Sequence, residues 1–321
     1  MEKIKFSKLN GQGNDFILID SLKKEIVLSD ELIRKICSRH FGIGADGVII
    51  VRHSSKADLF MDYYNSDGSI AEMCGNGIRC MARFAYENNL INSNKFVIET
   101  RAGLKSINIE ISESNSINEI EVDMGSPIFK PEKIPINIDF LNRNHDFAKA
   151  QFTKPSGSNI HFFLEKIRPD RPVFNYKLPV GKNIFIINCV SMGNPHCIIF
   201  IDKNKDLEKI DLHQIGPKIE NHPLFLNKTN VEFVRIENEN EISMIVWERG
   251  CGETLACGTG ACASVVAAVI LDLVSPLNPV KVNVKGGILK IKWNGNKKES
   301  VSLKGTVELS FIGEFNFQTN L

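Results

Sequence analysis

The chain has 321 residues, and its 39 basic and 38 acidic side chains leave a formal net charge of +1. This balance excludes a strong electrostatic attraction to nucleic acid or to an anionic membrane, so a small molecule is the expected partner. The length predicts two domains of about 150 residues each.

The N-terminus and the cysteine content predict the compartment. Residues 1–6 contain no apolar core of signal-peptide length, and no stretch reaches the roughly 18 apolar residues that a membrane helix needs. Eight cysteines in a chain of this length do not form a dense disulfide scaffold. We therefore expect a cytoplasmic protein whose cysteines are free thiols.

The first half of the chain has the pattern of a strand-rich domain. Runs of valine, isoleucine and phenylalanine at 16–19, 48–51 and 96–100 are separated by glycine, asparagine and serine, as antiparallel strands require. Between the first two runs, Ser29 is a suitable N-cap for a short helix whose apolar positions include Ile33.

A second helix is predicted directly after Cys74. Its apolar stripe is formed by Ile78, Met81, Ala82 and Ala85. Arg79, Arg83 and Glu87 follow at i, i+4 spacing on another face, so this helix is predicted to be less hidden than its counterpart in the second half.

Prolines at positions 127, 131 and 135 interrupt the strand pattern and predict a domain boundary. The first domain would comprise residues 1–130 and the second residues 131–306. Residues 138–182 are polar and have no clear counterpart in the first half, which indicates an insertion at the start of the second domain. Phenylalanines indicate that the insertion packs, and they stand at positions 140, 147, 152, 162, 163 and 174.

A helix without charged residues is predicted after Cys257. No charged side chain occurs from Ala261 to Leu271, so this helix must be buried on every side, as a helix threaded through a curled sheet would be. The run at 280–284 predicts a further strand.

The two halves superimpose at an offset near 183 residues. Cys74-Gly75-Asn76-Gly77 falls on Cys257-Gly258-Thr259-Gly260, and Asn65 falls on Glu248, nine residues before each cysteine. Residues 46–52 fall on 229–235, Gly13-Asn14 resembles Gly193-Asn194, and 96–103 resembles 280–287. Several motifs in the same order indicate an internal duplication.

The paired cysteines are the main indication of function. Each precedes a glycine-rich helix start, where unpaired N–H groups and the positive end of the helix dipole favour thiolate over thiol. A single cysteine in this position is ordinarily structural, but a matched pair predicts a two-sided acid/base site. The remaining cysteines are predicted core residues, except Cys251, which lies near the motif without a required role.

Six motifs together resemble the diaminopimelate epimerase family over nearly the whole chain. They are Gly11-Gln12-Gly13-Asn14-Asp15-Phe16, Gly42-Ile43-Gly44-Ala45-Asp46-Gly47, Asn65-Ser66-Asp67-Gly68-Ser69, Met73-Cys74-Gly75-Asn76-Gly77-Ile78-Arg79-Cys80, Met192-Gly193-Asn194-Pro195-His196, and the block from Glu248 to Ala261. The 138–182 region departs from the resemblance because it is longer than the family usually carries.

The resemblance implies an α+β fold of two homologous domains. Each would be a β-barrel-like, curled, mostly antiparallel sheet around a central helix, with the active site in the cleft between them. The last strand, near 307–317, would return to the first domain.

The resemblance also implies an activity, the interconversion of LL- and meso-diaminopimelate in lysine and peptidoglycan precursor biosynthesis, without a cofactor or a metal. Removal of a weakly acidic α-hydrogen and its return to the opposite face requires one base on each side, for which Cys74 and Cys257 are the candidates. Backbone N–H groups at the two helix starts, those of Gly75, Asn76, Gly258 and Thr259, are expected to bind the α-carboxylate.

By resemblance, further residues hold the far end of the substrate, and His196 helps to set the protonation of the cysteines. The set for the far end is Asn14, Asn65, Asn194, Asn230, Glu248 and Arg249. Their chemistry suits a second amino acid group, because arginine binds a carboxylate bidentately and a glutamate accepts from an ammonium. A homodimer is compatible with these expectations.

Other functions remain open at this stage. Proline and hydroxyproline racemases also use paired cysteines, but they usually have a histidine where Asn76 stands, and Glu248-Arg249 favours an acyclic substrate with a charged end. A related isomerase group uses a carboxylate in place of the first thiol, against which Cys74 argues. A thiol redox or zinc module is weakly supported, because the cysteines never form a C-x-x-C pair. A non-catalytic binding protein is the last alternative.

Overall fold

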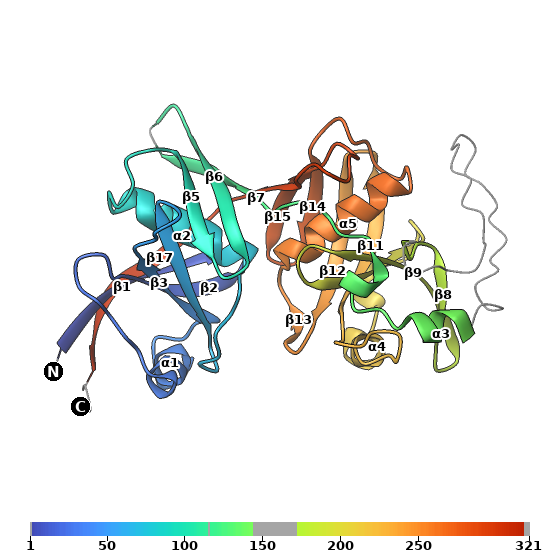
Figure 1. The fold of residues 1–321 in the computed structure, drawn as a ribbon, viewed down its shortest axis with the longest axis horizontal. Coiled ribbons are helices and arrows are strands. Elements are labelled where there is room, and N and C mark those ends of the chain that lie inside the picture. Colours follow the sequence, from blue (N-terminus) through green and yellow to red (C-terminus); the bar gives the residue numbers. More distant parts are fainter. Residues whose placement is uncertain (1, 115, 144–171, 318–321) are drawn as a thin grey trace. The chain divides into compact units, whose positions relative to one another are not determined.

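The computed structural model describes residues 2–114, 116–143 and 172–317, which form two compact units (Figure 1). The first unit is built from Met1–Met124, Gly286–Leu289 and Ser302–Leu321, and the second from Gly125–Lys285 and Lys290–Val301. In this division residues 125–130 lie in the second unit, and residues 286–289 and 302–306 lie in the first. The bounds predicted from the sequence place each of these segments in the other half.

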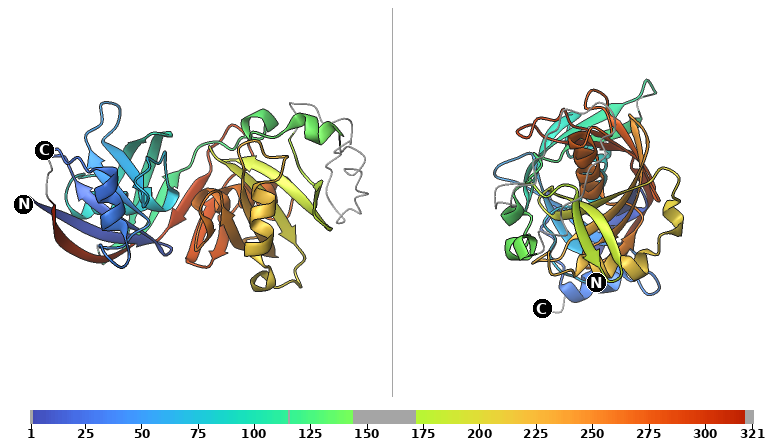
Figure 2. Two further views of the ribbon diagram at one scale, coloured as in Figure 1. Left: turned by 90° about the horizontal axis from the view of Figure 1, so that it is seen from below. Right: turned by 90° about the vertical axis from the view of Figure 1, so that its right-hand side faces the viewer.

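The first unit is a nine-stranded, mostly antiparallel sheet. Its strands are β1 (Glu2–Gly11), β2 (Asn14–Asp20), β3 (Gly47–Arg52), β4 (Leu59–Asn65), β5 (Lys95–Thr100), β6 (Gly103–Ile111), β7 (Ile117–Asp123), β16 (Ser302–Gly305) and β17 (Glu308–Phe317). They pair in the order β17, β1, β2, β3, β4, β5, β6, β7, β16, and only β2–β3 and β4–β5 are parallel. Because β17 pairs with β1, the first and last described residues lie side by side (Figures 1 and 2).

Two helices provide the crossovers that the parallel pairs require. Helix α1 (Asp30–Cys37) lies between β2 and β3, and helix α2 (Gly75–Glu87) lies between β4 and β5. α2 contacts β1, β2, β3, β6 and β7, so the sheet curls around it (Figure 1). This arrangement places the residue before α2, Cys74, at the edge of the sheet where β4 ends.

The second unit repeats this topology. Its strands are β8 (Tyr176–Val180), β9 (Asn183–Ser191), β10 (Pro195–Ile201), β11 (Asn230–Asn238), β12 (Glu241–Glu248), β13 (Gly252–Thr254) and β14 (Val280–Val284), and β15 (Gly287–Lys292) is divided between the units after Leu289. β9–β10 and β11–β12 are antiparallel, whereas β10–β11 and β12–β14 are parallel, as in the series from β1 to β5. The predicted α+β fold of two homologous domains is confirmed.

The helices of the second unit stand at the same points of the topology. α4 (Leu212–Glu220) lies between β10 and β11, and α5 (Gly258–Ile270) lies between β12 and β14. α2 and α5 each have 13 residues, and they begin 183 positions apart. The other helical segments of the described residues are α3 (Ile138–Arg143) and the short 3₁₀ helices η1 (Pro131–Lys133) and η3 (Leu207–Lys209).

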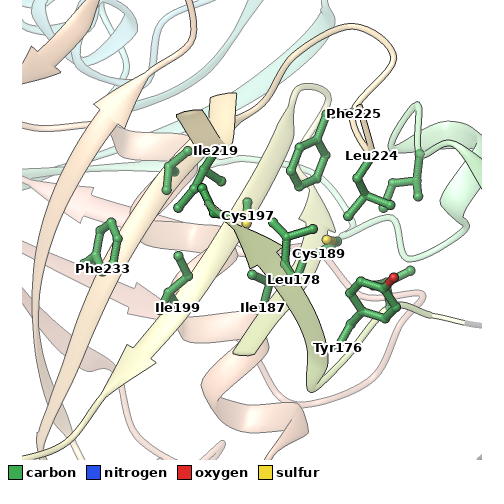
Figure 3. Packing of buried hydrophobic residues seen from close by; sticks show 14 of the residues in the cluster. Tyr176, Leu178, Ile187, Cys189, Cys197, Ile199, Ile219, Leu224, Phe225 and Phe233 are labelled. Atoms are coloured by element: carbon green, nitrogen blue, oxygen red, sulfur yellow. The ribbon is translucent and has the colours of Figure 1, made fainter. Parts of the chain in front are cut away.

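Strands β9, β10 and β11 are covered on both faces, which explains their nearly continuous apolar sequences. Figure 3 shows one face, where Cys189, Cys197 and Phe233 pack with Ile219 of α4 in a single buried cluster. Alternate residues point to the opposite face, which α5 contacts. Eleven of the 13 residues of α5 are buried, as its uncharged sequence predicts.

Most of the predicted insertion lies outside the described residues. This applies to 144–171, and with them to the phenylalanines at 147, 152, 162 and 163. Of the remaining two, Phe140 packs against the cluster of Figure 3, and the ring of Phe174 lies 6.1 Å from that of Phe129. The described flanks of the insertion therefore pack on the second unit.

Helix α1 begins at the predicted N-cap. The Ser29 hydroxyl accepts a hydrogen bond from the Leu32 N–H at 3.2 Å, and Ile33, Ile36 and Cys37 are buried. We expect Ser29→Ala to lower the free energy of unfolding by about 1 kcal/mol, because one N–H of the first turn loses its partner. Urea denaturation measures this change, and Ser29→Asp, which restores an acceptor, should recover most of the loss. An unchanged midpoint in Ser29→Ala would contradict the capping role.

Candidate active site

Cys74 occupies the N-cap position of α2. Its backbone is extended, with φ −135° and ψ 125°, and its Sγ accepts a hydrogen bond from the Gly77 N–H at 3.5 Å. The side chain is half-buried. Glycine is needed at 77, because a Cβ there would lie 3.0 Å from the Ile49 side chain and 3.4 Å from the Cys74 Cβ. The close packing of the helix start on β3 therefore places the thiol.

Asn14 directs a hydrogen-bond acceptor at this thiol. Its Oδ1 lies 3.5 Å from Cys74 Sγ and 3.3 Å from Asn76 Nδ2. Its Nδ2 donates to Asp46 Oδ2 at 2.6 Å, and Asp46 is held in turn by Arg39 at 2.7 Å. Since a carboxylate accepts only from the amide nitrogen, Asp46 fixes which end of the Asn14 amide faces the cysteine.

Arg79 belongs to the charged series of α2 but does not face the solvent. Its side chain is fully buried, and it donates to the Gly75 carbonyl and to Asn76 Oδ1, each at 2.9 Å, and to Gln12 Oε1. It thereby ties the helix start to the hairpin that carries Asn14. Only the end of the charged series faces outward, where Arg83 and Glu87 form a 2.9 Å ion pair.

Asn65 lies at the end of β4, opposite Gly47 in the register. Its Nδ2 donates to Ser69 Oγ at 3.0 Å, and its N–H donates to the Ser69 carbonyl. These contacts close the 65–69 turn, and the N–H of Ser66 donates to the Asp46 carbonyl. Asn65 is thus on the same edge of the sheet as Asn14, and the two amides donate to different partners, Ser69 and Asp46.

Cys257 occupies the equivalent N-cap position of α5 and is buried, with 4% of its surface exposed. Its Sγ lies 3.5 Å from the Thr259 hydroxyl. Burial raises the pKa of the Cys257 thiol well above its usual value, and the carboxylates of Glu248 and Glu232 act in the same direction. The Thr259 hydroxyl and the Gly260 N–H act against them. The Gly260 N–H at the helix start thus favours the thiolate, as expected, but burial of Cys257 outweighs this contribution in the free protein.

This raised pKa predicts how Cys257 reacts with iodoacetamide in the free protein. Because the thiolate is the nucleophile and the pKa of Cys257 is raised, alkylation of Cys257 should be slow near pH 7 and should keep accelerating to higher pH than alkylation of an ordinary thiol. Cys251 is exposed and serves as the internal comparison. Tandem mass spectrometry of the peptide that contains both cysteines measures both rates. A ratio of the two rates that stays constant with pH would contradict the raised pKa.

A chain of hydrogen bonds leads from Cys257 into the interior of the second unit. Asn194 Nδ2 donates to Thr259 Oγ1 at 3.2 Å, and Asn194 Oδ1 lies 3.0 Å from His196 Nε2. His196 Nδ1 lies 2.7 Å from Glu232 Oε1, and both side chains are fully buried. The sequence prediction includes Asn194, Thr259 and His196 but misses Glu232. A carboxyl group inside the apolar run of residues 231–234 was the available signal.

The other candidates of the second unit surround the Glu248–Arg249 turn. Asn230 Nδ2 donates to the Pro195 carbonyl at 2.8 Å, and Asn230 Oδ1 accepts from the Arg249 N–H at 2.9 Å. Glu248 Oε1 accepts from the Thr254 hydroxyl at 2.5 Å. The Arg249 side chain is exposed, and its Nη1 donates to the Asn227 carbonyl at 3.3 Å. Asn230 therefore holds the backbone at Pro195 and at Arg249, whereas the Arg249 side chain presents a charged group at the surface.

Within each unit, these contacts join a cysteine, a helix start and an asparagine from the preceding hairpin. The hairpin turns need left-handed backbone, with φ 80° at Gly13 and 99° at Gly193. Each set offers a thiol at a helix N-terminus, where the positive end of the helix dipole suits proton transfer next to a bound carboxylate. Among the described residues, no group of three or more His, Cys, Asp or Glu side chains is placed to hold a metal ion.

The remaining cysteines divide as predicted. Cys37, Cys80, Cys189, Cys197 and Cys262 are buried, and Cys251 is exposed. Burial raises the pKa of the Cys37 thiol to about 12.

In the part of the chain that the structure describes, no helix is long and apolar enough to cross a membrane.

Comparison with known proteins agrees with this geometry. The family model described as diaminopimelate epimerase matches residues 6–130 and 188–310, which include every candidate site residue. The diaminopimelate epimerase of Leptospira biflexa is 40% identical over 312 residues, covering 97% of this chain and 99% of the relative.

Two solved structures share the fold. A phenazine biosynthesis protein of Bacillus anthracis has a TM-score of 0.64 at 16% identity, covering 99% of this chain and 100% of that chain. A hydroxyproline epimerase of Agrobacterium vitis has a TM-score of 0.63 at 10% identity, covering 97% of this chain and 92% of that chain. The family match and the 40% identical relative extend over both units, and the chain belongs to the diaminopimelate epimerase family.

Proposed function

We propose that the protein interconverts LL- and meso-diaminopimelate by a cofactor-independent, two-base reaction. The observation that carries the proposal is the repeated Cys-Gly-x-Gly helix start, present once in each of two units of the same topology. Membership of the diaminopimelate epimerase family supports the choice of substrate.

In this reaction the two cysteines act on opposite faces of the α-carbon. One enters as a thiolate and removes the α-proton, the other enters as a thiol and donates a proton to the opposite face, and the roles exchange in the reverse direction. Because burial raises the pKa of Cys257 in the free protein even though the Thr259 hydroxyl acts against it, the thiolate must gain further stabilisation from the bound substrate.

The α-carboxylate would bind to the two helix starts. The N–H groups of Gly75 and Asn76 belong to the first turn of α2, and those of Gly258 and Thr259 to the first turn of α5. N–H groups of a first turn point out of the helix N-terminus, where an anion can bind. Negative charge grows on the carboxylate as the α-proton leaves, so these donors stabilise the transition state more than the ground state. Removal of one such donor typically costs about 10²–10³ in rate.

We assign the far amino acid group of the substrate to Asn14, Asn65, Asn194, Asn230, Glu248 and Arg249. The exposed guanidinium of Arg249 suits the distal carboxylate, and Glu248 suits the distal ammonium. Three of the asparagines already hold neighbouring groups of the site, so they also keep its shape: Asn14, Asn194 and Asn230. His196 supports the second cysteine through Asn194.

We further propose that the enzyme acts in the cytoplasm on free diaminopimelate, in lysine and peptidoglycan precursor synthesis, without nucleic acid or membrane. A proline or hydroxyproline racemase is the alternative, because the hydroxyproline epimerase of Agrobacterium vitis shares the fold. Asn76 and Glu248-Arg249 favour the acyclic, doubly charged substrate over the cyclic one.

Proton NMR in D₂O tests the proposal. The reduced protein is incubated with LL-diaminopimelate and, in parallel, with L-proline. Loss of the α-proton signal from diaminopimelate with growth of the meso isomer is the expected result. Exchange from proline alone would transfer the assignment to the racemases, and inertness toward both would refute an epimerase of either kind.

A further inference from the structure

Glu232 is a fully buried carboxyl group for which the reaction above has no role. It lies on β11 between Val231 and Phe233, which belong to the cluster on the opposite face of the sheet (Figure 3 labels Phe233). Its Oε1 lies 2.7 Å from His196 Nδ1, whereas its Oε2 has no hydrogen-bond partner among the described residues.

Such a carboxyl group is costly to bury. A residue needed only to fill the strand would be apolar, as Ile49 is at the equivalent position of the first unit, 183 residues earlier. Glycine at 260 makes room for it, because a Cβ there would lie 2.7 Å from Glu232 Oε1. The fold therefore accommodates this oxygen beside the start of α5 at the expense of stability.

The direction of each hydrogen bond in the chain follows from its neighbours. His196 Nε2 faces the carbonyl oxygen of Asn194, so this nitrogen carries a hydrogen and donates. Asn194 then presents its Nδ2 to Thr259 Oγ1, which accepts. The hydroxyl proton of Thr259 is left for the sulfur of Cys257, 3.5 Å away.

Glu232 sets these hydrogen-bond directions through its contact with His196. His196 has a hydrogen on Nε2 when the pair carries two protons, one on Nε2 and one between Oε1 and Nδ1. The Glu232 carboxyl is then neutral and donates to Nδ1, or a carboxylate faces an imidazolium. A carboxylate that faced a neutral imidazole would take the N–H of Nδ1 and leave Nε2 without a hydrogen. Burial raises the pKa of the Glu232 carboxyl, which favours retention of the proton near neutral pH. Without Glu232, the imidazole can lose its hydrogen from Nε2 and the Asn194 amide can turn over. Asn194 would then direct its oxygen at Thr259, and the Thr259 hydroxyl would donate to that oxygen and no longer to the Cys257 sulfur.

We propose that Glu232 is a positioning residue that acts through His196, Asn194 and Thr259 to aim a hydrogen-bond donor at Cys257. This inference rests on the proposed function, in which Cys257 is one of the two bases. The first unit presents the opposite polarity, because Asp46 turns the acceptor end of Asn14 toward Cys74. A two-base reaction that pairs a thiolate with a thiol suits a donor at one sulfur and an acceptor at the other.

A double-mutant cycle on the LL-diaminopimelate reaction tests the proposal. The variants are Glu232→Leu, Thr259→Val and the double variant. We expect each single change to lower kcat by about tenfold or more, because the thiolate loses its donor, with KM within about twofold. If Glu232 acts through the Thr259 hydroxyl, the double variant should be no slower than Thr259→Val alone.

Two variants sharpen the cycle. Glu232→Gln can donate to His196 Nδ1 from its amide and should keep kcat within about threefold of the wild type. Ser264→Ala removes another buried hydroxyl from α5, which donates to the Met244 sulfur. Among the described residues, this hydroxyl has no hydrogen bond to Glu232, His196, Asn194 or Thr259. Its effect on kcat should multiply with that of Glu232→Leu, as expected for independent sites.

The outcomes separate this inference from the proposed function. If the wild type is active and the effects of Glu232→Leu and Thr259→Val on kcat multiply, the positioning role is wrong. Multiplied effects are what a mere loss of folded protein would give, because that loss lowers activity equally in the wild type and in Thr259→Val. An equal loss in Glu232→Gln would also overturn it. A wild type without exchange overturns the proposed function itself, and the inference with it. If Glu232→Leu does not fold, His196→Met interrupts the hydrogen bonds at the next residue and takes the place of Glu232→Leu in the double-mutant cycle.

Discussion

Cys74→Ala and Cys257→Ala should each abolish epimerisation, with kcat at least about 10³-fold below the wild type. Either change removes the acid or the base from one face of the α-carbon, and a positioned acid or base typically contributes 10²–10⁴-fold to the rate. Proton NMR in D₂O measures the reaction. In the wild type, deuterium should enter the newly formed isomer before it enters the recovered substrate, because the proton that is added comes from the second thiol after exchange with solvent.

The same helices provide matched controls for these substitutions. Cys80 in α2 and Cys262 in α5 are fully buried and lie six and five positions after the two candidate bases. Cys80→Ala and Cys262→Ala should keep kcat within about threefold of the wild type, because they remove a small core side chain on which the chemistry does not depend. If Cys74→Ala or Cys257→Ala retained comparable activity, the two-base mechanism would be wrong.

Phe16→Ala should lower the free energy of unfolding by about 3–5 kcal/mol. Phe16 is fully buried on β2, two residues after Asn14, and its ring meets that of Tyr63 edge-on with centroids 5.7 Å apart. Truncation leaves a cavity between the sheet and α2 that close-packed neighbours fill only in part. Guanidinium denaturation followed by circular dichroism measures the loss.

Phe41→Ala is the control within the same unit. This ring is 89% exposed, so the same truncation should change the free energy of unfolding by no more than about 0.5 kcal/mol. Equal losses from the two substitutions would mean that Phe16 does not lie in a close-packed core of the first unit.

The geometry suggests that the duplication preserves a scaffold while the details of each half diverge. Both units place a cysteine at the N-cap of a 13-residue helix and an asparagine in the preceding hairpin. Asp46 orients the asparagine of the first unit directly, whereas the asparagine of the second is oriented through His196. A symmetric pair of sites would give both sulfurs the same hydrogen-bonding partner. The divergence offers one sulfur an acceptor and the other a donor.

Much of the fold can be predicted from local patterns in the amino-acid sequence. The strand runs, the N-cap at Ser29 and the uncharged helix after Cys257 could be predicted, because each rests on periodicity or capping within about ten residues. The duplication could be predicted as well, since its motifs recur at a nearly constant offset. The same repeat singled out Cys74 and Cys257 as a pair.

The environment of the charged groups, by contrast, depends on contacts between segments that are far apart in the sequence. Arg79 follows the pattern of a surface charge along α2, yet it is buried because strands β1 and β16, which come from opposite ends of the chain, enclose that face of the helix. Glu232 becomes the partner of His196 because β10 and β11 pair in parallel across α4, a register that no local pattern reveals. The pKa of Cys257 rises because desolvation depends on everything packed around the thiol, whereas the helix start that the sequence displays is a single local contribution.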